Sequence, residues 1–246
     1  MHKFIFSETS ISLVTGITFA LVLTGLRKLL PPKPFRNTLL VLLSWITLLT
    51  ILSLSGFFAD FSALPPRVGL ALILPLPIVL YIALSPAGAR LLQNTPPHWL
   101  VYLQTFRIGV ELVLWLSFWK GLIPVQMSFE GRNFDVLSGL LALPVGYYCL
   151  VKKKGPRWIL PLYNIAGLLL LLNIIIIAVL SMPTPLRYFH NEPANTAVGH
   201  FPFIFLPTLL VPLAYTLHIF SLRQYILTRA PLTQFLNSSR DSPPPP

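Results

Sequence analysis

Long apolar runs recur along this chain of 246 residues, and they leave few folds open to it. About 20 helical residues cross a hydrocarbon core of about 30 Å, and seven runs approach that length. Hydrophobic residues make up 54% of the chain and charged residues only 10%, against about 25% charged in a soluble domain. The sequence therefore predicts an all-α polytopic membrane protein, a bundle of seven transmembrane helices. The predicted spans are Ile11–Leu26, Thr38–Phe58, Val68–Leu84, Trp99–Trp119, Phe134–Val151, Trp158–Ser181 and Phe201–Leu222.

Lys and Arg are concentrated in alternate gaps between these spans, as expected of residues that set membrane topology. The gaps at 27–36, 90 and 152–157 and the segment after 222 are rich in them, whereas the other gaps are poor in net charge. This alternation requires an odd number of spans, so the N-terminus is predicted outside and the C-terminus in the cytoplasm. The formal charge of +11 is attributed to topology, and nucleic acid is excluded as a partner.

The predicted domain organisation follows from the same pattern. Residues 1–227 form the seven-helix transmembrane domain, and residues 228–246 form a disordered, proline-rich cytoplasmic tail. The single cysteine, Cys149, lies inside an apolar run, so a disulfide within the chain is excluded.

Prolines indicate where two of the helices bend. Pro75 and Pro77 fall in the third span, and Pro202, Pro207 and Pro212 fall along the seventh. Each interior proline removes a backbone hydrogen bond and kinks its helix. Such a helix can border a cavity, although irregular packing alone is the favoured interpretation.

Small residues at four-residue spacing form two ridges that permit close helix contact. Packing inside the bundle is favoured over a dimer interface for both. The ridges are Ser12, Gly16, Ala20 and Thr24 in the first span, and Ser138, Ala142 and Gly146 in the fifth.

The fourth span carries three polar side chains that share one helix face, because Gln104, Arg107 and Glu111 are three and four residues apart. Each charge at mid-span costs about 2.5–3.5 kcal/mol, which one intrahelical Arg–Glu pair hardly offsets. We therefore expect this face to turn inward, toward polar groups of other spans. From its position along the sixth span, Asn173 is expected at the membrane depth of Glu111. The residues expected at the depth of Gln104 are Asn164, Tyr215 and His218. Two interpretations stay open: a buried ion pair that fixes helix rotation, and a site for a polar ligand or a proton.

Two connectors on the predicted outer side are dense in polar residues. In Gln126–Asp135, Asn133 or Asp135 is expected to cap the fifth span, and Glu130 to pair with Arg132. The second connector, Ser181–Asn195, is stiffened by three prolines. Together they are expected to fold into a lid whose mouth is lined by Arg132, Arg187, His190, Glu192 and Asn195.

No metal or other cofactor is predicted. Glu130, Asp135, His190, Glu192 and His200 have suitable ligand chemistry, but no two of them show a recognised metal spacing. The chain lacks a hydrolase, metalloprotease or nucleotide-binding motif where one could work, so no catalytic residue is assigned. The segments Arg132–Asp135 and Asn191–Asn195 resemble uncharacterised multi-span proteins of bacteria, and this resemblance implies a seven-helix membrane protein without implying an activity.

The favoured hypothesis is a bacterial inner-membrane protein whose bundle binds or transports a small polar, anionic or lipid-derived ligand. The alternative is a structural or assembly subunit, in which the same polar residues contact a partner membrane protein. An intramembrane enzyme using Glu111 or the outer His and Glu residues has no supporting motif. The predicted ligand-binding residues are Gln104, Arg107, Glu111, Asn173, Arg132, Arg187, His190 and Glu192.

Overall fold

The computed structural model describes residues 2–240, with side chains described for residues 7–228. The described residues form helices and no strands. The α-helices are α1 (His2–Leu29), α2 (Pro32–Leu54), α3 (Arg67–Ile73), α4 (Pro75–Leu84), α5 (Pro86–Asn94), α6 (Pro97–Tyr102), α7 (Phe106–Trp119), α8 (Val136–Val145), α9 (Ile159–Leu180) and α10 (Val211–Arg240). Short 3-10 or π-helical segments are η1 (Phe57–Ala59), η2 (Leu103–Thr105), η3 (Val125–Met127), η4 (Gly146–Val151), η5 (Ala197–Gly199) and η6 (Leu206–Leu210).

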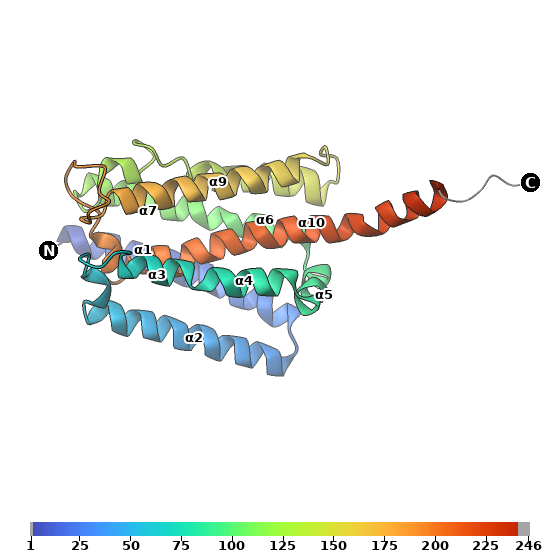
Figure 1. Cartoon of the computed structure of the whole chain (residues 1–246), viewed down its shortest axis with the longest axis horizontal. Coiled ribbons are helices and arrows are strands. Elements are labelled where there is room, and N and C mark those ends of the chain that lie inside the picture. Colours follow the sequence, from blue (N-terminus) through green and yellow to red (C-terminus); the bar gives the residue numbers. More distant parts are fainter. Residues whose placement is uncertain (1, 241–246) are drawn as a thin grey trace, which may run out of the picture.

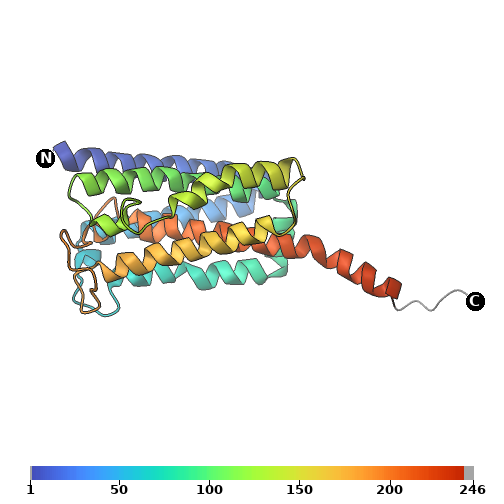
Figure 2. The same ribbon diagram turned by 90° about the horizontal axis from the view of Figure 1, so that it is seen from above.

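The long helices lie side by side in one bundle, and α10 projects beyond it at one end (Figures 1 and 2). Six helical segments among the described residues are long and apolar enough to cross a membrane. They are Ser7–Leu29, Pro32–Leu54, Arg67–Leu84, Pro97–Trp119, Ile159–Leu180 and Leu206–Thr228. The fifth predicted span corresponds to a shorter apolar helix, Val136–Val151, made of α8 and η4.

The predicted boundary of the tail at residue 228 stays a prediction. The backbone of α10 continues as a helix to Arg240, and residues 241–246 lie outside the described part of the chain. The part of the predicted disordered tail at 241–246 lies outside the described residues.

Prolines interrupt the helices at three places. The third span divides at Leu74, where α3 ends and Pro75 begins α4. Pro207 lies in the π-helical turn η6, which leads into α10. Pro202 was expected within the seventh span but precedes the helix. Pro144 lies inside α8, and the π-helical segment η4 follows it.

The two small-residue ridges face opposite environments. Ser138, Ala142 and Gly146 are buried, as predicted, and a Cβ on Gly139 would come 3.1 Å from the backbone nitrogen of Ile108 in α7. The ridge in α1 was expected to pack inside the bundle, but it is exposed. Ile11, Thr15 and Thr18 form the buried face of α1 instead. The exposed residues of the ridge are Ser12, Gly16, Ala20 and Thr24.

The connectors at the end of the bundle that contains the N-terminus belong to the hydrophobic core. The largest buried cluster joins helix residues such as Leu49 and Val113 to Phe58, Ile123 and Val198 from the connectors. Such packing holds the connectors against the end of the bundle, which is the end that contains the N-terminus in Figure 1.

Candidate functional site

A buried ion pair joins Arg107 of α7 to Asp135, the residue that precedes α8. The exposed fractions of the two residues are 2% and 5%. Arg107 Nε donates to Asp135 Oδ2 at 2.7 Å, and Nη2 donates to Asp135 Oδ1, so the pair is bidentate. The sequence left open an ion pair between Arg107 and Glu111, and made Asn133 or Asp135 the cap of the next helix. In the structure the connector folds into the bundle, so that Asp135 pairs with Arg107 and occupies the N-cap position of α8 without a side-chain capping hydrogen bond.

The other donors of Arg107 also meet protein acceptors. Nη1 donates to Ser138 Oγ at 2.9 Å and to His218 Nε2 at 2.8 Å, and Nη2 reaches the carbonyl oxygen of Gly167 at 3.5 Å. A guanidinium has five N–H donors, and these contacts together with the two to Asp135 match that number. No N–H of Arg107 is left for an external anion.

His218 extends this network across α10. Arginine has no acceptor, so His218 Nε2 must accept from Arg107, and the ring proton lies on Nδ1. Nδ1 then donates to Asn164 Oδ1 at 2.9 Å, and Asn164 Nδ2 donates to Ser221 Oγ at 2.9 Å. These hydrogen bonds join α7, α8, α9 and α10 at one level.

Close packing at Gly167 makes this junction possible. A Cβ at Gly167 would lie 2.7 Å from Ser138 Oγ and would overlap the ring of His218. Tyr163 OH, one turn away on α9, donates to the carbonyl oxygen of Ser138 at 3.0 Å. The network is thus enclosed by backbone and side chains.

Glu111 lies one turn from Arg107 but has a different environment. It is 1% exposed, and Asn133 Nδ2 donates to Oε1 at 2.8 Å and to Oε2 at 2.7 Å. Asn133 Oδ1 accepts from the backbone N–H of Asp135, which fixes the orientation of the amide. Arg107, the basic residue one turn away, is paired with Asp135, and the hydrogen bonds to Glu111 come from the amide of Asn133.

A small cavity is lined in part by Glu111. Its volume is about 100 Å³, and its walls come from α3, α7, α9 and η6. Glu111 and Asp135 are the acidic groups in a lining of otherwise apolar residues, among them Leu72, Ile175 and Pro207. A drug-sized ligand needs about 300 Å³ or more, so this cavity suits a few water molecules or one small cation.

The inward orientation predicted for Gln104, Arg107 and Glu111 is confirmed, since none is more than 2% exposed. Gln104 does not join the ion-pair network. Its Nε2 donates to the carbonyl oxygen of Ala214 at 3.0 Å, and its Oε1 is buried without a partner. Asn173 does not reach Glu111 as expected but donates to the carbonyl oxygen of Arg132 at 2.9 Å.

The other predicted site residues lie on the connectors Gln126–Asp135 and Ser181–Asn195, away from the lining of the cavity. The guanidinium of Arg132 stacks on Phe189, 5.4 Å from the ring centre, and His190 is exposed. Arg187 donates to Glu192 Oε1 at 2.9 Å, and this hydrogen bond, with one from the N–H of Ala194, holds the pKa of Glu192 below its usual value.

The two connectors contact each other through Gln126. Asn191 Nδ2 donates to Gln126 Oε1 at 2.7 Å, and Gln126 Nε2 donates to Ser181 Oγ at 2.8 Å. Glu130 accepts from the indole N–H groups of Trp115 and Trp119 instead of pairing with Arg132 as expected. Among the described residues, no three His, Cys, Asp or Glu side chains gather as a metal site would require.

The fold and the buried polar centre define a helical membrane protein. The chain belongs to the family described as domain of unknown function DUF8737, whose sequence model matches residues 65–226. That range contains Arg107, Glu111, Asp135 and His218, whereas α1 and α2 precede it. Neither a curated protein nor a solved structure matches the chain.

Proposed function

We propose that this protein is a seven-span protein of a bacterial inner membrane, with the N-terminus outside and the C-terminus in the cytoplasm. The alternation of basic gaps supports this topology. The apolar helix Val136–Val151 supplies the remaining crossing, because its ten α-helical residues rise about 15 Å, the π-helical residues of η4 extend it further, and the connector before it already lies within the bundle.

The function that the geometry supports best is the uptake of a proton or a small monovalent cation at Glu111. One observation carries this proposal: Glu111, which is 1% exposed and hydrogen-bonded to an amide, lines a cavity of about 100 Å³. A carboxylate at this depth is costly unless a proton or a cation neutralises it. Asp135, the other carboxylate of the cavity, is already paired with Arg107.

This proposal narrows the ligand classes expected from the sequence. An anion has little support, because the donors of Arg107 are taken by protein acceptors. A lipid-derived or other large ligand has little support at this site, because the cavity is too small for it. Transport or sensing would then depend on exchange of the proton or cation at Glu111.

Infrared difference spectroscopy of the reconstituted protein tests the proposal. Stepping the pH, or replacing Na⁺ or K⁺ by a large organic cation, should change a carboxyl C=O band that Glu111→Gln removes. Glu130→Gln, which alters an outer carboxyl group bonded to two tryptophans, is the matched control and should leave the band unchanged. If Glu111→Gln folds and its difference spectrum equals that of the wild type, the proposal is wrong.

A second function, assembly with another membrane protein, is favoured by the exposed ridge of α1. No heavy atom lies within 4 Å of a Cβ built on Gly16, so a partner helix has room to approach there. Copurification in mild detergent tests this function. A stoichiometric partner should be lost in Gly16→Leu and retained in Leu13→Ile, a change of shape at another exposed position of α1.

A further inference from the structure

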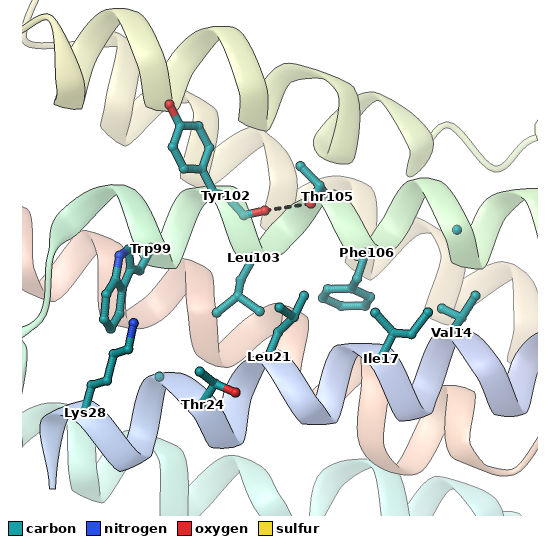
Figure 3. Close-up of a pocket in the computed structure, with 12 residues that line it drawn as sticks. Val14, Ile17, Leu21, Thr24, Lys28, Trp99, Tyr102, Leu103, Thr105 and Phe106 are labelled. Atoms are coloured by element: carbon teal, nitrogen blue, oxygen red, sulfur yellow. Dashed lines mark hydrogen bonds between the residues drawn. The ribbon is translucent and has the colours of Figure 1, made fainter.

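A long groove runs between α1 and the continuous helix formed by α6, η2 and α7 (Figure 3). Its volume is about 580 Å³, far larger than the cavity at Glu111. Ile17, Leu21 and Thr24 line one side, and Trp99, Leu103 and Phe106 line the other. The groove opens outward, since Ile17 and Leu21 are 54% and 57% exposed.

One end of the groove is positively charged. Lys28 extends from the last turn of α1 toward Trp99, and its Nζ lies 5.7 Å from the centre of the indole ring (Figure 3). Lys28 is exposed, and its contact with the face of an indole ring leaves N–H donors of the ammonium for an anion. Arg27, Lys33 and Arg36 lie nearby in the sequence and strengthen the positive potential at this end.

The length and chemistry of the groove match one lipid molecule. Lys28 and Ile17 are eleven residues apart on a helix, a rise of about 16 Å, which is close to half of a 30 Å hydrocarbon core. Tryptophan and lysine at the end of a span are typical of the level of lipid headgroups. The apolar part of the groove therefore lies at the depth of an acyl chain.

We propose that this groove binds one anionic phospholipid from the leaflet on the Lys28 side. The phosphate pairs with Lys28 and lies beside Trp99, while one acyl chain follows Leu21, Leu103 and Phe106 into the bilayer. The charge of Lys28 selects an anionic headgroup over a zwitterionic one. This site is separate from Glu111 and does not depend on the function proposed there.

Trp99 provides the readout for a direct test. In a variant that keeps Trp99 and carries phenylalanine at the other four tryptophans, bromine on a lipid acyl chain quenches the indole on contact. The protein is placed in phosphatidylcholine vesicles that contain a small mole fraction of brominated phosphatidylglycerol or, separately, of brominated phosphatidylcholine. We expect phosphatidylglycerol to be enriched about five-fold at Trp99, the factor that one lysine near an anionic surface supplies.

Lys28→Gln should abolish this enrichment, whereas Lys33→Gln, an exposed basic residue on the next helix, should preserve most of it. Thr24→Phe, which fills the groove, should reduce quenching by both brominated lipids. If the tryptophan-depleted variant does not fold, native mass spectrometry of the wild type and Lys28→Gln should show one retained phosphatidylglycerol in the former only.

Three results would overturn the proposal. Equal quenching by the two brominated lipids would show that the groove has no headgroup preference. Relief of quenching by inorganic phosphate would show a phosphate site that needs no acyl chain. Protection of Trp99 from both lipids would show that a second copy of the chain, or another helix, covers the groove.

Discussion

The buried polar centre depends on the guanidinium group of Arg107. It pairs with Asp135 where neither side chain reaches water, and its remaining donors contact Ser138, His218 and Gly167. A buried pair of this kind adds little net stability over apolar residues, but removing one partner leaves an uncompensated charge. The loss of one partner is therefore much more damaging than the loss of both.

We accordingly expect Asp135→Ala to lower the free energy of unfolding by about 3–5 kcal/mol. The double variant Arg107→Met with Asp135→Ala should lose less than the sum of the two single variants, because the charge left behind is then absent. Titration of the purified protein from mild detergent into dodecyl sulfate measures both. Glu130→Ala is the control, because Glu130 is bonded to two indole N–H groups and not to Arg107. If the losses of the two single variants simply added in the double variant, this account of the pair would be wrong.

Two glycines give a second prediction at the scale of the residue. Gly167→Ala places a methyl group against His218 and Ser138 Oγ, and we expect a loss of about 1–3 kcal/mol in the free energy of unfolding. Gly16→Ala meets open space in the middle of α1 and should be stabilising by up to about 1 kcal/mol. The same detergent titration compares the two variants. Equal effects would mean that α9 and α10 are not in close contact at Gly167.

Sequence reasoning found the buried residues of α7 but not their partners. The cost of a charge in hydrocarbon predicts correctly that Arg107 and Glu111 turn inward. The four-residue spacing leaves a pair between Arg107 and Glu111 open, because nothing in the local pattern shows how deeply a distant connector enters the bundle. Asp135, 28 residues from Arg107, is expected from the sequence only as one of two candidate helix caps, the other being Asn133.

At the scale of the element, the connectors are packed structures and not loose links. Asp60 and Glu192 illustrate how their charges are held. Hydrogen bonds from the hydroxyl and the N–H of Ser62, together with Arg67, lower the pKa of Asp60. A hydrogen bond from Arg187 is the main cause of the lowered pKa of Glu192. Both carboxylates lie in connectors on the predicted outer side of the membrane.

These lowered pKa values predict how the connector around Glu192 responds to acid. Its folded pKa lies below the usual value of 4.5, so its contribution to local order is complete above about pH 4.5 and is lost as the pH falls through the lowered pKa. Hydrogen exchange at residues 187–194, corrected for the intrinsic effect of pH, should accelerate over that interval. Glu192→Gln should exchange faster at neutral pH and show no further acceleration. A wild-type profile independent of pH would exclude this role for the Arg187 pair.

The sequence gives little indication of which face of a helix turns toward the inside of the bundle. Both ridges of small residues satisfy the same spacing rule, yet Ser138 and Ala142 are buried and Gly16 and Ala20 are exposed. In a membrane protein the lipid-facing and packed surfaces are both apolar, so the period of hydrophobicity does not distinguish them. Only a costly polar group, such as Arg107 in α7, indicates which face is inside.

At the scale of the whole molecule, the helices are arranged so that the N-terminus and the projecting end of α10 lie at opposite ends of the bundle (Figure 1). The turn between α1 and α2, helix α5 and the turn before α9 lie at the end from which α10 projects (Figures 1 and 2). These are the gaps that the sequence marks as rich in Lys and Arg. The alternation of basic gaps depends on the order of all the spans, so an error of a few residues in the boundary of one span does not change it.

Topology provides the last prediction, because α8 and η4 form a helix shorter than the six long candidates. In a background of Cys149→Ser, new cysteines at Ser62 and His190 should react in intact cells with a thiol reagent that does not cross membranes. Cysteines at Lys33 and Lys153 should react only after the cells are opened. If Val136–Val151 did not cross, Lys153 would lie on the same side as Ser62, and His190 would lie on the opposite side. Reaction at Lys153 together with protection at His190 would therefore replace seven spans by six and reverse every assignment after α8.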